Sequence, residues 1–461
     1  MQRTFEIAKR SRSDAVAFDL NSGAGRITPR QWVICGVAAL GFAFDLYEVI
    51  VLPMVLRPAL VSLGHLNPNS PGFNNWVGLI FYLPLACGGM FGFLGGYLTD
   101  LFGRRRVLVW SILLYAFSAC ATAYATTLPE FLLFRCATVV GVCVEYVAGI
   151  AWLAELFPNP RRRESVLGYT QAAFGFGGLL ATAAYYLAVT YGDRLPALHG
   201  GHEAWRYTLL SGLVPAFPLL LTRPFLPESQ IWIEKKTRGI LQRPSVKELF
   251  RPALQRTTLV SMTLVACSYA LASGVILHTP RMVPGLPQLR GLFPRSLEQT
   301  VSSVQMFQEL GTIAGRFLFA LLVIRIAGQR QLLRIFLIPG LAVFAWVYFF
   351  AVLHSLALLK VGIFLAGLFL NAAFSFWGNY LPRIYPTHLR GTGESFSLNI
   401  GARLLGPLAA ITTTQLVSVM PASGPAAQLA YSAGTVAVLA YSGSLIGSFW
   451  LREPESAQLP D

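Results

Sequence analysis

The sequence predicts an all-α membrane protein with twelve transmembrane helices in two pseudo-symmetric six-helix bundles. Three observations favour this fold class. Only 12% of the 461 residues are charged, whereas soluble domains carry about 25%. Twelve apolar stretches have about the 20 residues that a helix needs to cross a bilayer. Loop patterns in the first half of the chain also return in the second half. The composition argues against a soluble enzyme and against a nucleic-acid-binding protein.

The expected spans follow one another along the chain with polar loops between them. We place them at residues 31–56, 75–99, 107–126, 128–156, 167–190, 206–225, 257–279, 300–324, 335–353, 356–381, 392–418 and 429–450. The residues before the first span contain no short apolar core followed by a small-residue cleavage site. We therefore expect the first span to be retained as a helix.

The formal net charge of +15 is explained by membrane topology rather than by a nucleic-acid partner. With the N-terminus in the cytoplasm, 25 of the 36 Lys and Arg residues fall on the cytoplasmic side and about 7 on the opposite side. Such an excess in short loops is the positive-inside pattern. We expect a multi-pass protein of the plasma (inner) membrane, monomeric in the lipid bilayer, with both termini in the cytoplasm.

The longest basic hydrophilic stretch inside the chain divides the spans six plus six. We expect a cytoplasmic N-terminal segment, an N-terminal six-helix bundle, a cytoplasmic central loop, a C-terminal six-helix bundle and a cytoplasmic tail, at residues 1–30, 31–226, 227–256, 257–451 and 452–461. The halves echo each other, since Pro158 and Pro386 are 228 residues apart, and so are Arg162 and Arg390. Two related halves predict a substrate site between them, near the middle of the membrane.

Several motifs resemble those of the major facilitator superfamily. The stretch GYLTDLFGRR at residues 96–105 is similar to the superfamily signature between helices 2 and 3. PESQIW at residues 227–232 resembles the PES motif of the sugar porters and related metabolite:H⁺ symporters. The fourth span and the loop after it are similar to the same branches at Arg135, Glu145, Glu155, Pro158 and Arg162. The seventh span lacks the glutamine pair and the asparagine of true hexose carriers, which argues against a sugar substrate.

The resemblance covers nearly the whole chain and implies transport by alternating access, with helices 2 and 11 meeting at a cytoplasmic gate. The residues that we assign to this gate motif are Gly96, Asp100, Gly103, Arg104, Arg105, Glu155, Arg162 and Arg390. Asp100 would then accept hydrogen bonds from a helix N-terminus and from basic loop residues. Such contacts would break as the halves rock.

Three carboxylates within the spans are candidates for proton coupling. An ionisable side chain at the centre of a span costs about 2.5–3.5 kcal/mol, which makes it a functional candidate. Asp45 and Glu48 lie three residues apart and share a helix face. Burial and a like-charged neighbour favour protonation, so we expect these two residues and Glu145 to carry the proton. The alternative is a structural carboxylate hydrogen-bonded to a neighbouring helix.

Arginines within the spans are candidates for binding an anionic substrate. Arg135 could hold a substrate carboxylate, pair with Asp45, or lock helix 1 to helix 4. Arg403 is the candidate in the second half. Glu309 and Arg316 lie seven residues apart on one face and are expected to form a charged intramembrane pair. Polar and aromatic candidates for the substrate site are Gln171, Tyr269, Asn371, Trp377, Asn379 and Asn399.

Other chemistries find no support in the sequence. There is no GxxxxGK[ST] phosphate loop and no HExxH motif. We therefore expect no enzymatic reaction, no metal site and no cofactor, with the proton gradient as the energy source. The sequence is interpreted as a secondary active transporter, a proton-coupled symporter of a small organic metabolite. An organic acid is favoured by the intramembrane arginines. The alternatives are sugar or polyol symport, proton-driven export, and a transporter-like sensor that moves no solute.

Overall fold

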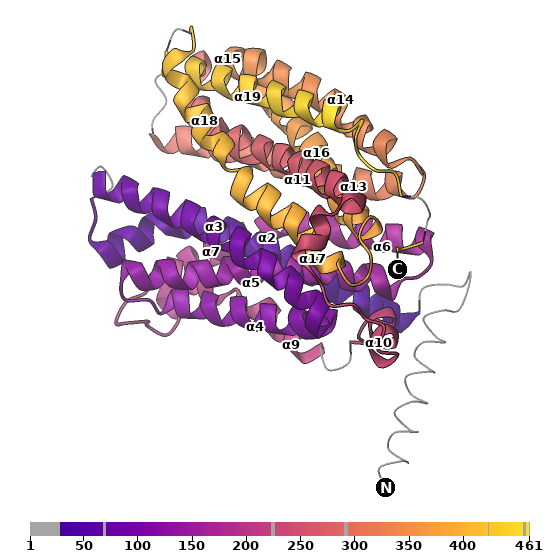
Figure 1. Cartoon of the computed structure of the whole chain (residues 1–461). Helices are drawn as coiled ribbons and strands as arrows, with labels where there is room; N and C mark the ends of the chain where they lie inside the picture. Colours follow the sequence, from indigo (N-terminus) through magenta and orange to yellow (C-terminus); the bar gives the residue numbers. More distant parts are fainter. Residues whose placement is uncertain are drawn as a thin grey trace.

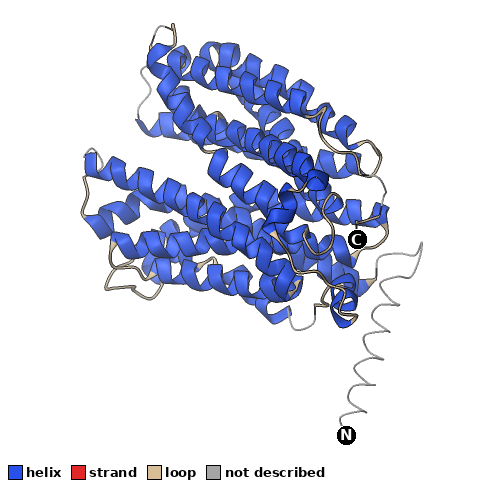
Figure 2. Cartoon of the chain, in the orientation of Figure 1, coloured by secondary structure: helices blue, strands red, loops and turns tan. Residues whose placement is uncertain are grey.

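The structure, a computed structural model, describes residues 28–67, 71–222, 226–289, 294–422, 424–454 and 458–460. Within these residues the regular structure is helical, apart from one isolated antiparallel bridge between Leu198 and Gly201 (Figure 2). The expected N-terminal segment, residues 1–30, lies outside the described part of the chain except for its last three residues.

The first half of the chain folds into long helices joined by short loops. Its elements are α2 (Pro29–Gly64), α3 (Pro71–Phe102), α4 (Arg104–Ala123), α5 (Leu128–Leu156), α6 (Pro160–Ala172), η1 (Ala173–Phe176), α7 (Gly177–Tyr191), α8 (Ala204–Leu210) and α9 (Leu213–Thr222). Two of these helices begin at capping boxes, one between Thr28 and Gln31 and one between Thr127 and Glu130. Each box satisfies backbone amides that have no partner within the helix.

The second half repeats this arrangement after a short connecting helix, α10 (Gln230–Thr237). Its main elements are α11 (Pro252–Gly274), α12 (Thr279–Met282), α13 (Pro294–Val323), α14 (Gln329–Trp346), η8 (Val347–Ala351), α15 (Val352–His354), α16 (Leu356–Tyr380), α17 (Arg390–Ser395), η10 (Phe396–Leu405), α18 (Leu408–Leu416) and α19 (Pro425–Gly447).

Ten stretches of the described helices are long and apolar enough to cross a membrane. The sixth and eleventh predicted spans are not among them because each is interrupted. The sixth is divided between α8 and α9 by a turn at residues 211–212, and the eleventh passes from α17 through the π-helix η10 and a turn at Gly406–Pro407 into α18. The turn in the eleventh span contains Pro407, and proline lacks the amide hydrogen that would continue a helix. The pieces pack along α2 and α4 and along α3 and α11, so they run beside the other crossings.

The two halves form two layers that meet at one end of the molecule. In Figure 1 the first half is coloured indigo to magenta and the second half red to yellow, and the layers come together where α6 and α17 lie. Contacts join α3 to α17 and η10, and α6 to α13 and α16. This end carries the segments 103–106, 159–163 and 383–390, at the starts of α4, α6 and α17, together with α10. We call it the basic face because arginine and lysine residues gather there.

A close approach between α3 and α17 holds the halves together at the basic face. A Cβ atom at Gly96 would collide with the side chain of Ser395 and the carbonyl oxygen of Gly391. The Ser395 hydroxyl donates a hydrogen bond to the carbonyl oxygen of Gly92 at 2.8 Å. Small residues permit such backbone contacts between membrane helices. As a result, Asp100, one turn beyond Gly96, reaches the start of α17.

Candidate functional site

Asp100, in the last turn of α3, binds the first turn of α17. One carboxylate oxygen accepts a hydrogen bond from the backbone amide of Gly391 at 2.9 Å. The other accepts from the amide and the hydroxyl of Thr392, both at 2.7 Å. Arg104 lies 3.2 Å from the carboxylate. Amides in the first turn of a helix have no partner within it, so the carboxylate completes their hydrogen bonding. These contacts are of the kind expected for Asp100, and its role in gating stays a prediction.

Glu155, near the end of α5, joins two arginines that come from different halves. It accepts hydrogen bonds from Arg104 at 2.9 Å and from Arg390. Arg104 also donates to the backbone carbonyl of Thr387 at 2.6 Å, and Arg390 donates to that of Pro382 at 3.1 Å. All three charged side chains are buried. Moving the two halves apart would leave these buried charges without partners, which is energetically costly. The network is therefore expected to hold the halves together at the basic face.

The remaining residues of the predicted gate motif shape the loop and helix starts at the basic face. Gly103 has a φ of 100°, a conformation that favours glycine, and lies against Glu228. The backbone amide of Arg105 donates to both carboxylate oxygens of Glu228, at 3.1 and 3.2 Å. Arg162 is half-buried near the start of α6, and its neighbour Arg163 is the arginine that is fully buried there.

A second layer of polar contacts joins the halves deeper in the molecule. Glu164 pairs with Arg383 at 2.8 Å and accepts a hydrogen bond from Asn379 at 3.2 Å. The Gln171 amide donates to the side-chain oxygen of Asn379 at 3.1 Å, and the Tyr146 hydroxyl donates to Gln171 at 3.2 Å. Two of the predicted substrate residues, Gln171 and Asn379, thus bind each other across the halves in this conformation.

The expected ion pair between Glu309 and Arg316 is absent from the described structure. Arg316 turns toward α16, where it donates to Asn371 at 3.3 Å, and its guanidinium lies 4.5 Å from the ring centroid of Phe174. Glu309 accepts a hydrogen bond from Gln308 at 3.4 Å. Seven residues advance a helix by about 10 Å. The shared face is real, but the separation along the axis is too long for direct contact.

Two other predicted substrate residues are engaged within the second half. The Trp377 indole donates to the hydroxyl of Ser268 at 3.2 Å. Asn399 donates to the hydroxyl of Ser395 at 2.8 Å. Both Trp377 and Asn399 are buried. Their side chains therefore pack and order the helices around the site in this conformation.

Arg135 pairs with Glu48 rather than with Asp45. The guanidinium lies 3.3 Å from the Glu48 carboxylate and donates to the backbone carbonyl of Glu48 at 2.7 Å. Asp45 lies three residues earlier on α2, which is about 4.5 Å along the helix axis. That step carries Asp45 out of reach of Arg135. The pair joins α2 to α5, so the lock between helix 1 and helix 4 is the alternative that the structure forms.

Asp45 is a buried carboxylate without a hydrogen-bond partner. It is 2% exposed, and neither of its oxygens has a partner among the described residues. The charges that act on it are those of Glu145, Arg403 and Glu48. An isolated ionised carboxylate is costly in an apolar environment. Such a group is therefore favoured in its neutral form unless a cation or a hydrogen-bond donor binds it.

Arg403, in the other half of the molecule, interacts electrostatically with Asp45. The groups that interact electrostatically with Arg403 are Cys143, Tyr269, Asp45 and Tyr146. Arg403 and the two tyrosines keep part of their surface accessible although they lie within the predicted spans. The π-helix η10 supplies Arg403, α5 supplies Tyr146 and α11 supplies Tyr269. Arg403, from the second half, therefore interacts electrostatically with Asp45 and Tyr146 of the first half and with Tyr269 of its own half.

Glu145 lies between α5 and α2, inside the first half. One carboxylate oxygen approaches Gly41, and the side chain lines a small cavity of about 20 Å³ with Phe42, Leu108 and Trp152. Its charge acts on Asp45. Glu145 and Asp45 thus form a like-charged pair of buried carboxylates on adjacent helices.

Glu394 is a buried carboxylate that the sequence analysis missed. It is completely buried in α17, and neither oxygen has a hydrogen-bond partner among the described residues. Arg390, Asp100, Glu155 and Arg104 are the charges that act on it. The signal was available, because Glu394 is an acidic residue inside the predicted span 392–418. Glu394 lies near the start of that span, whereas the cost of an ionisable side chain is greatest at the centre.

The described residues contain no group of three or more His, Cys, Asp or Glu side chains that could hold a metal ion. The arrangement of the centre instead suits the binding of an anion and a proton. Arg403 offers a positive charge, and Asp45 offers a protonatable oxygen on which that charge acts.

The chain is similar to known membrane transporters over most of its length. The family model described as Major Facilitator Superfamily matches residues 33–410. The chain is 28% identical to the 4-hydroxybenzoate transporter PcaK of Pseudomonas aeruginosa, over 81% of this chain and 84% of that protein. It is 25% identical to the niacin transporter NiaP of Acinetobacter baylyi, over 84% and 87%. The fold is similar to that of the proton:xylose symporter XylE of E. coli, with a TM-score of 0.67, 20% identity, and coverage of 89% of this chain and 94% of that one.

Proposed function

This chain belongs to the major facilitator superfamily of membrane transporters, and we propose that it is a proton-coupled symporter of small organic acids. It is a transporter, not an enzyme. The observation that carries the proposal is the burial of Asp45, which has no hydrogen-bond partner among the described residues, within the electrostatic influence of Arg403 from the other half.

The coupling follows from charge balance at this point. An ionised Asp45 attracts Arg403 and repels an approaching carboxylate, because charges interact strongly where water is excluded. A proton on Asp45 removes both effects and leaves the Arg403 guanidinium to bind the substrate carboxylate. Arginine is suited to this contact because its planar fork matches a carboxylate. Proton and anion thus load together, and neither loads well alone. Glu145 shares the proton with Asp45 as its like-charged neighbour.

The side chains around Arg403 favour an acid that carries a ring. Tyr146 and Tyr269 keep accessible surface beside the guanidinium, and aromatic walls with few polar groups are typical of small-molecule sites. PcaK and NiaP carry names that specify 4-hydroxybenzoate and niacin, both of which bear a carboxylate on a six-membered aromatic ring. These observations support a small aromatic carboxylate as the substrate.

We assign the basic face to the cytoplasm of a cell whose inner membrane holds the protein, with both termini on that side. The excess of Lys and Arg in the loops supports this orientation. The proton gradient supplies the energy, no cofactor is bound, and the monomer is the transporting unit. The hydrogen bonds of Asp100, Glu155 and Glu164 across the halves close the cytoplasmic side in this conformation. Their rupture would open that side for release.

Purified full-length protein in liposomes loaded with a pH-sensitive dye tests the proposal. Aromatic acids, other carboxylates and sugars are added outside one at a time, and protein-free liposomes correct for passive entry of weak acids. We expect internal acidification with an aromatic acid, which Asp45→Asn abolishes. The matched control is Asp193→Asn, which changes an exposed acid outside the spans. Acidification with sugars alone, or with no compound, would contradict the proposal.

A further inference from the structure

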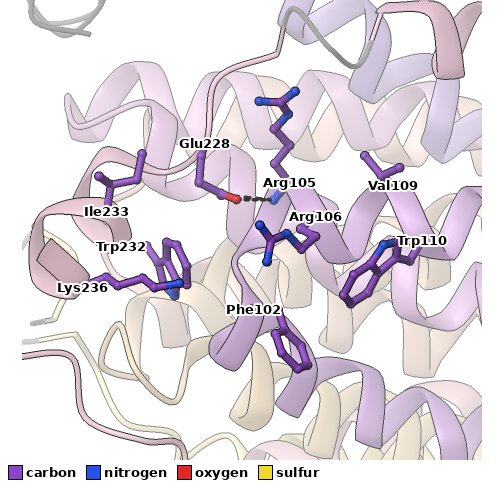
Figure 3. A pocket seen from close by; sticks show the side chains of 9 residues that line it. All are labelled: Phe102, Arg105, Arg106, Val109, Trp110, Glu228, Trp232, Ile233 and Lys236. Carbon is purple, nitrogen blue, oxygen red and sulfur yellow. Dashed lines mark hydrogen bonds between the residues drawn. The ribbon is translucent and has the colours of Figure 1, made fainter. Parts of the chain in front are cut away.

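A cavity of about 640 Å³ lies at the basic face beside the gate, and the transport cycle proposed above does not use it (Figure 3). The end of α3, the start of α4 and the short helix α10 enclose it. The side chains that matter for its chemistry are Phe102, Arg105, Arg106, Trp110, Trp232 and Lys236. The first four come from the α3–α4 region, and the last two come from α10.

The polar rim of the cavity has an excess of positive charge. Three basic side chains line it together with a single acidic one, Glu228. The Glu228 carboxylate is occupied by backbone amides, those of Arg105 at 3.1 and 3.2 Å and of Ser229 at 3.0 Å. Arg106 and Lys236 are exposed, and neither forms an ion pair with an acidic residue in the described part of the chain. The rim is therefore suited to an anion.

The opposite wall of the cavity is apolar and exposed. The rings of Phe102 and Trp110 meet edge to face, with centroids 5.6 Å apart, and are 37% and 47% exposed. Trp110 lies four residues beyond Arg106 along α4, which is about 6 Å further into the span. Basic residues at a span end followed by an exposed tryptophan are typical of the membrane–water interface. The wall thus leads from the charged rim toward the hydrocarbon.

The third side of the cavity is α10, which is anchored to the transmembrane helices. The Trp232 indole donates a hydrogen bond to the backbone carbonyl of Asp100 at 2.9 Å. Lys236 places its ammonium group 4.5 Å from the centroid of the Trp232 ring. This cation–π contact orients the ammonium group on the cavity side of α10. Figure 3 shows Lys236 and Trp232 on one side of the cavity and Phe102 and Trp110 on another.

We propose that this cavity binds an anionic phospholipid of the cytoplasmic leaflet. The lipid phosphate lies between Arg106 and Lys236, and an acyl chain runs along Phe102 and Trp110. Both requirements are met at one place: a net positive rim, and an exposed aromatic wall that continues into the span. Basic pockets between transmembrane helices on the cytoplasmic side are suited to anionic headgroups. The proposal depends on charge and position at the basic face, and it holds whichever solute the protein carries.

Native mass spectrometry of the delipidated full chain tests the proposal, by counting bound phosphatidylglycerol and phosphatidylcholine at stepped lipid concentrations. We expect tighter binding of phosphatidylglycerol. The double variant Arg106→Gln/Lys236→Gln should weaken it by about tenfold or more, given that each basic residue near an anionic surface contributes about 1 kcal/mol. The matched control, Arg238→Gln/Arg243→Gln, removes the same charge from exposed positions outside the cavity and should change binding less than twofold.

Three outcomes would overturn the proposal. Equal binding of the two lipids would exclude headgroup selection by charge. Equal loss in both double variants would mean that net charge, and not the cavity, attracts the lipid. Displacement of phosphatidylglycerol by millimolar inorganic phosphate would identify a site for free phosphate instead. The substituted side chains are exposed, and a monodisperse elution profile for each variant confirms that it remains folded.

Discussion

The acids at positions 45 and 48 of α2 are separated by less than one helical turn, yet the structure places them in different environments. Glu48 is paired with Arg135, whereas Asp45 has no hydrogen-bond partner in the described part of the chain and interacts electrostatically with Arg403. We therefore expect Asp45→Asn to abolish proton-driven accumulation while retaining substrate exchange, because the amide mimics the protonated acid and cannot release a proton. Counterflow in liposomes measures the exchange, and dye acidification measures the coupling. Loss of counterflow in a folded Asp45→Asn protein would show that Asp45 does more than carry a proton.

Arg403 is the cation expected to bind the substrate carboxylate. Hydrogen bonds to charged groups contribute about 1.5–3 kcal/mol, so Arg403→Gln should weaken substrate binding roughly 10- to 150-fold. Arg403→Lys should recover part of the affinity, because it restores the charge without the planar fork. Equilibrium binding of the transported acid to the purified variants gives the comparison. Unchanged affinity in Arg403→Gln would remove Arg403 from the site.

The Glu48–Arg135 pair is expected to act on stability. Both side chains are buried, and removing one partner of a buried pair costs about 3–5 kcal/mol. Glu48→Gln should therefore lower the thermal unfolding temperature in detergent more than the double variant Glu48→Gln/Arg135→Met does. The substitution Arg135→Met removes the positive charge that Glu48→Gln leaves without a partner. A double variant that is less stable than Glu48→Gln would instead indicate that Arg135 stabilises the fold independently of Glu48.

At the scale of elements, we expect opening of the basic face to depend on the contact between the end of α3 and the start of α17. Asp100 accepts three hydrogen bonds from α17 there. The substitution Asp100→Asn replaces one accepting oxygen with an NH₂ donor. This donor would point at the donors of Gly391 or Thr392, so a hydrogen bond is lost. We therefore expect the basic face to open more often. Spin labels at Arg161→Cys and Arg325→Cys, exposed on opposite halves, should report longer distances in this variant.

The control for this measurement is Asp193→Asn with the same labels, which should leave the distance distribution unchanged. The unsubstituted chain gives the background from its six native cysteines. If Asp100→Asn retained the wild-type distances, Asp100 would not hold the gate closed. The nearby Glu155–Arg390 pair would then be the contact that keeps the basic face shut.

At the scale of the whole molecule, the position of the basic residues predicts which end faces the cytoplasm. In intact cells, a membrane-impermeant thiol reagent should label Asp193→Cys but not Arg238→Cys, and permeabilised cells should show labelling of both. Both positions are exposed, so the difference reports sidedness and not burial. The reverse pattern would invert the topology and with it the assignment of the basic face.

Local patterns were sufficient for the helices and insufficient for most contacts between them. The span predicted at residues 128–156 coincides with α5, because its ends are marked by a capping box and by a change in hydropathy. Glu309 and Arg316, predicted as a charged pair, interact electrostatically but form no direct ion pair in the described structure, because a shared helix face says nothing of the distance along the axis. Gln171 and Asn379, 208 residues apart, bind each other through a packing that no local pattern describes.

The sequence by itself determined that the chain crosses a membrane many times, which end carries the positive charge, and which ionisable side chains lie within the spans. These properties depend on the order of residues along one helix or one loop. The tertiary structure alone decided which of the buried charges meet. It paired Arg135 with Glu48, placed Arg403 where its charge acts on Asp45 without an ion pair, and enclosed Glu394 at the basic face. The physical reason is that an ion pair requires atoms within about 4 Å, and the rotation and depth of each helix are set by its packing against the others.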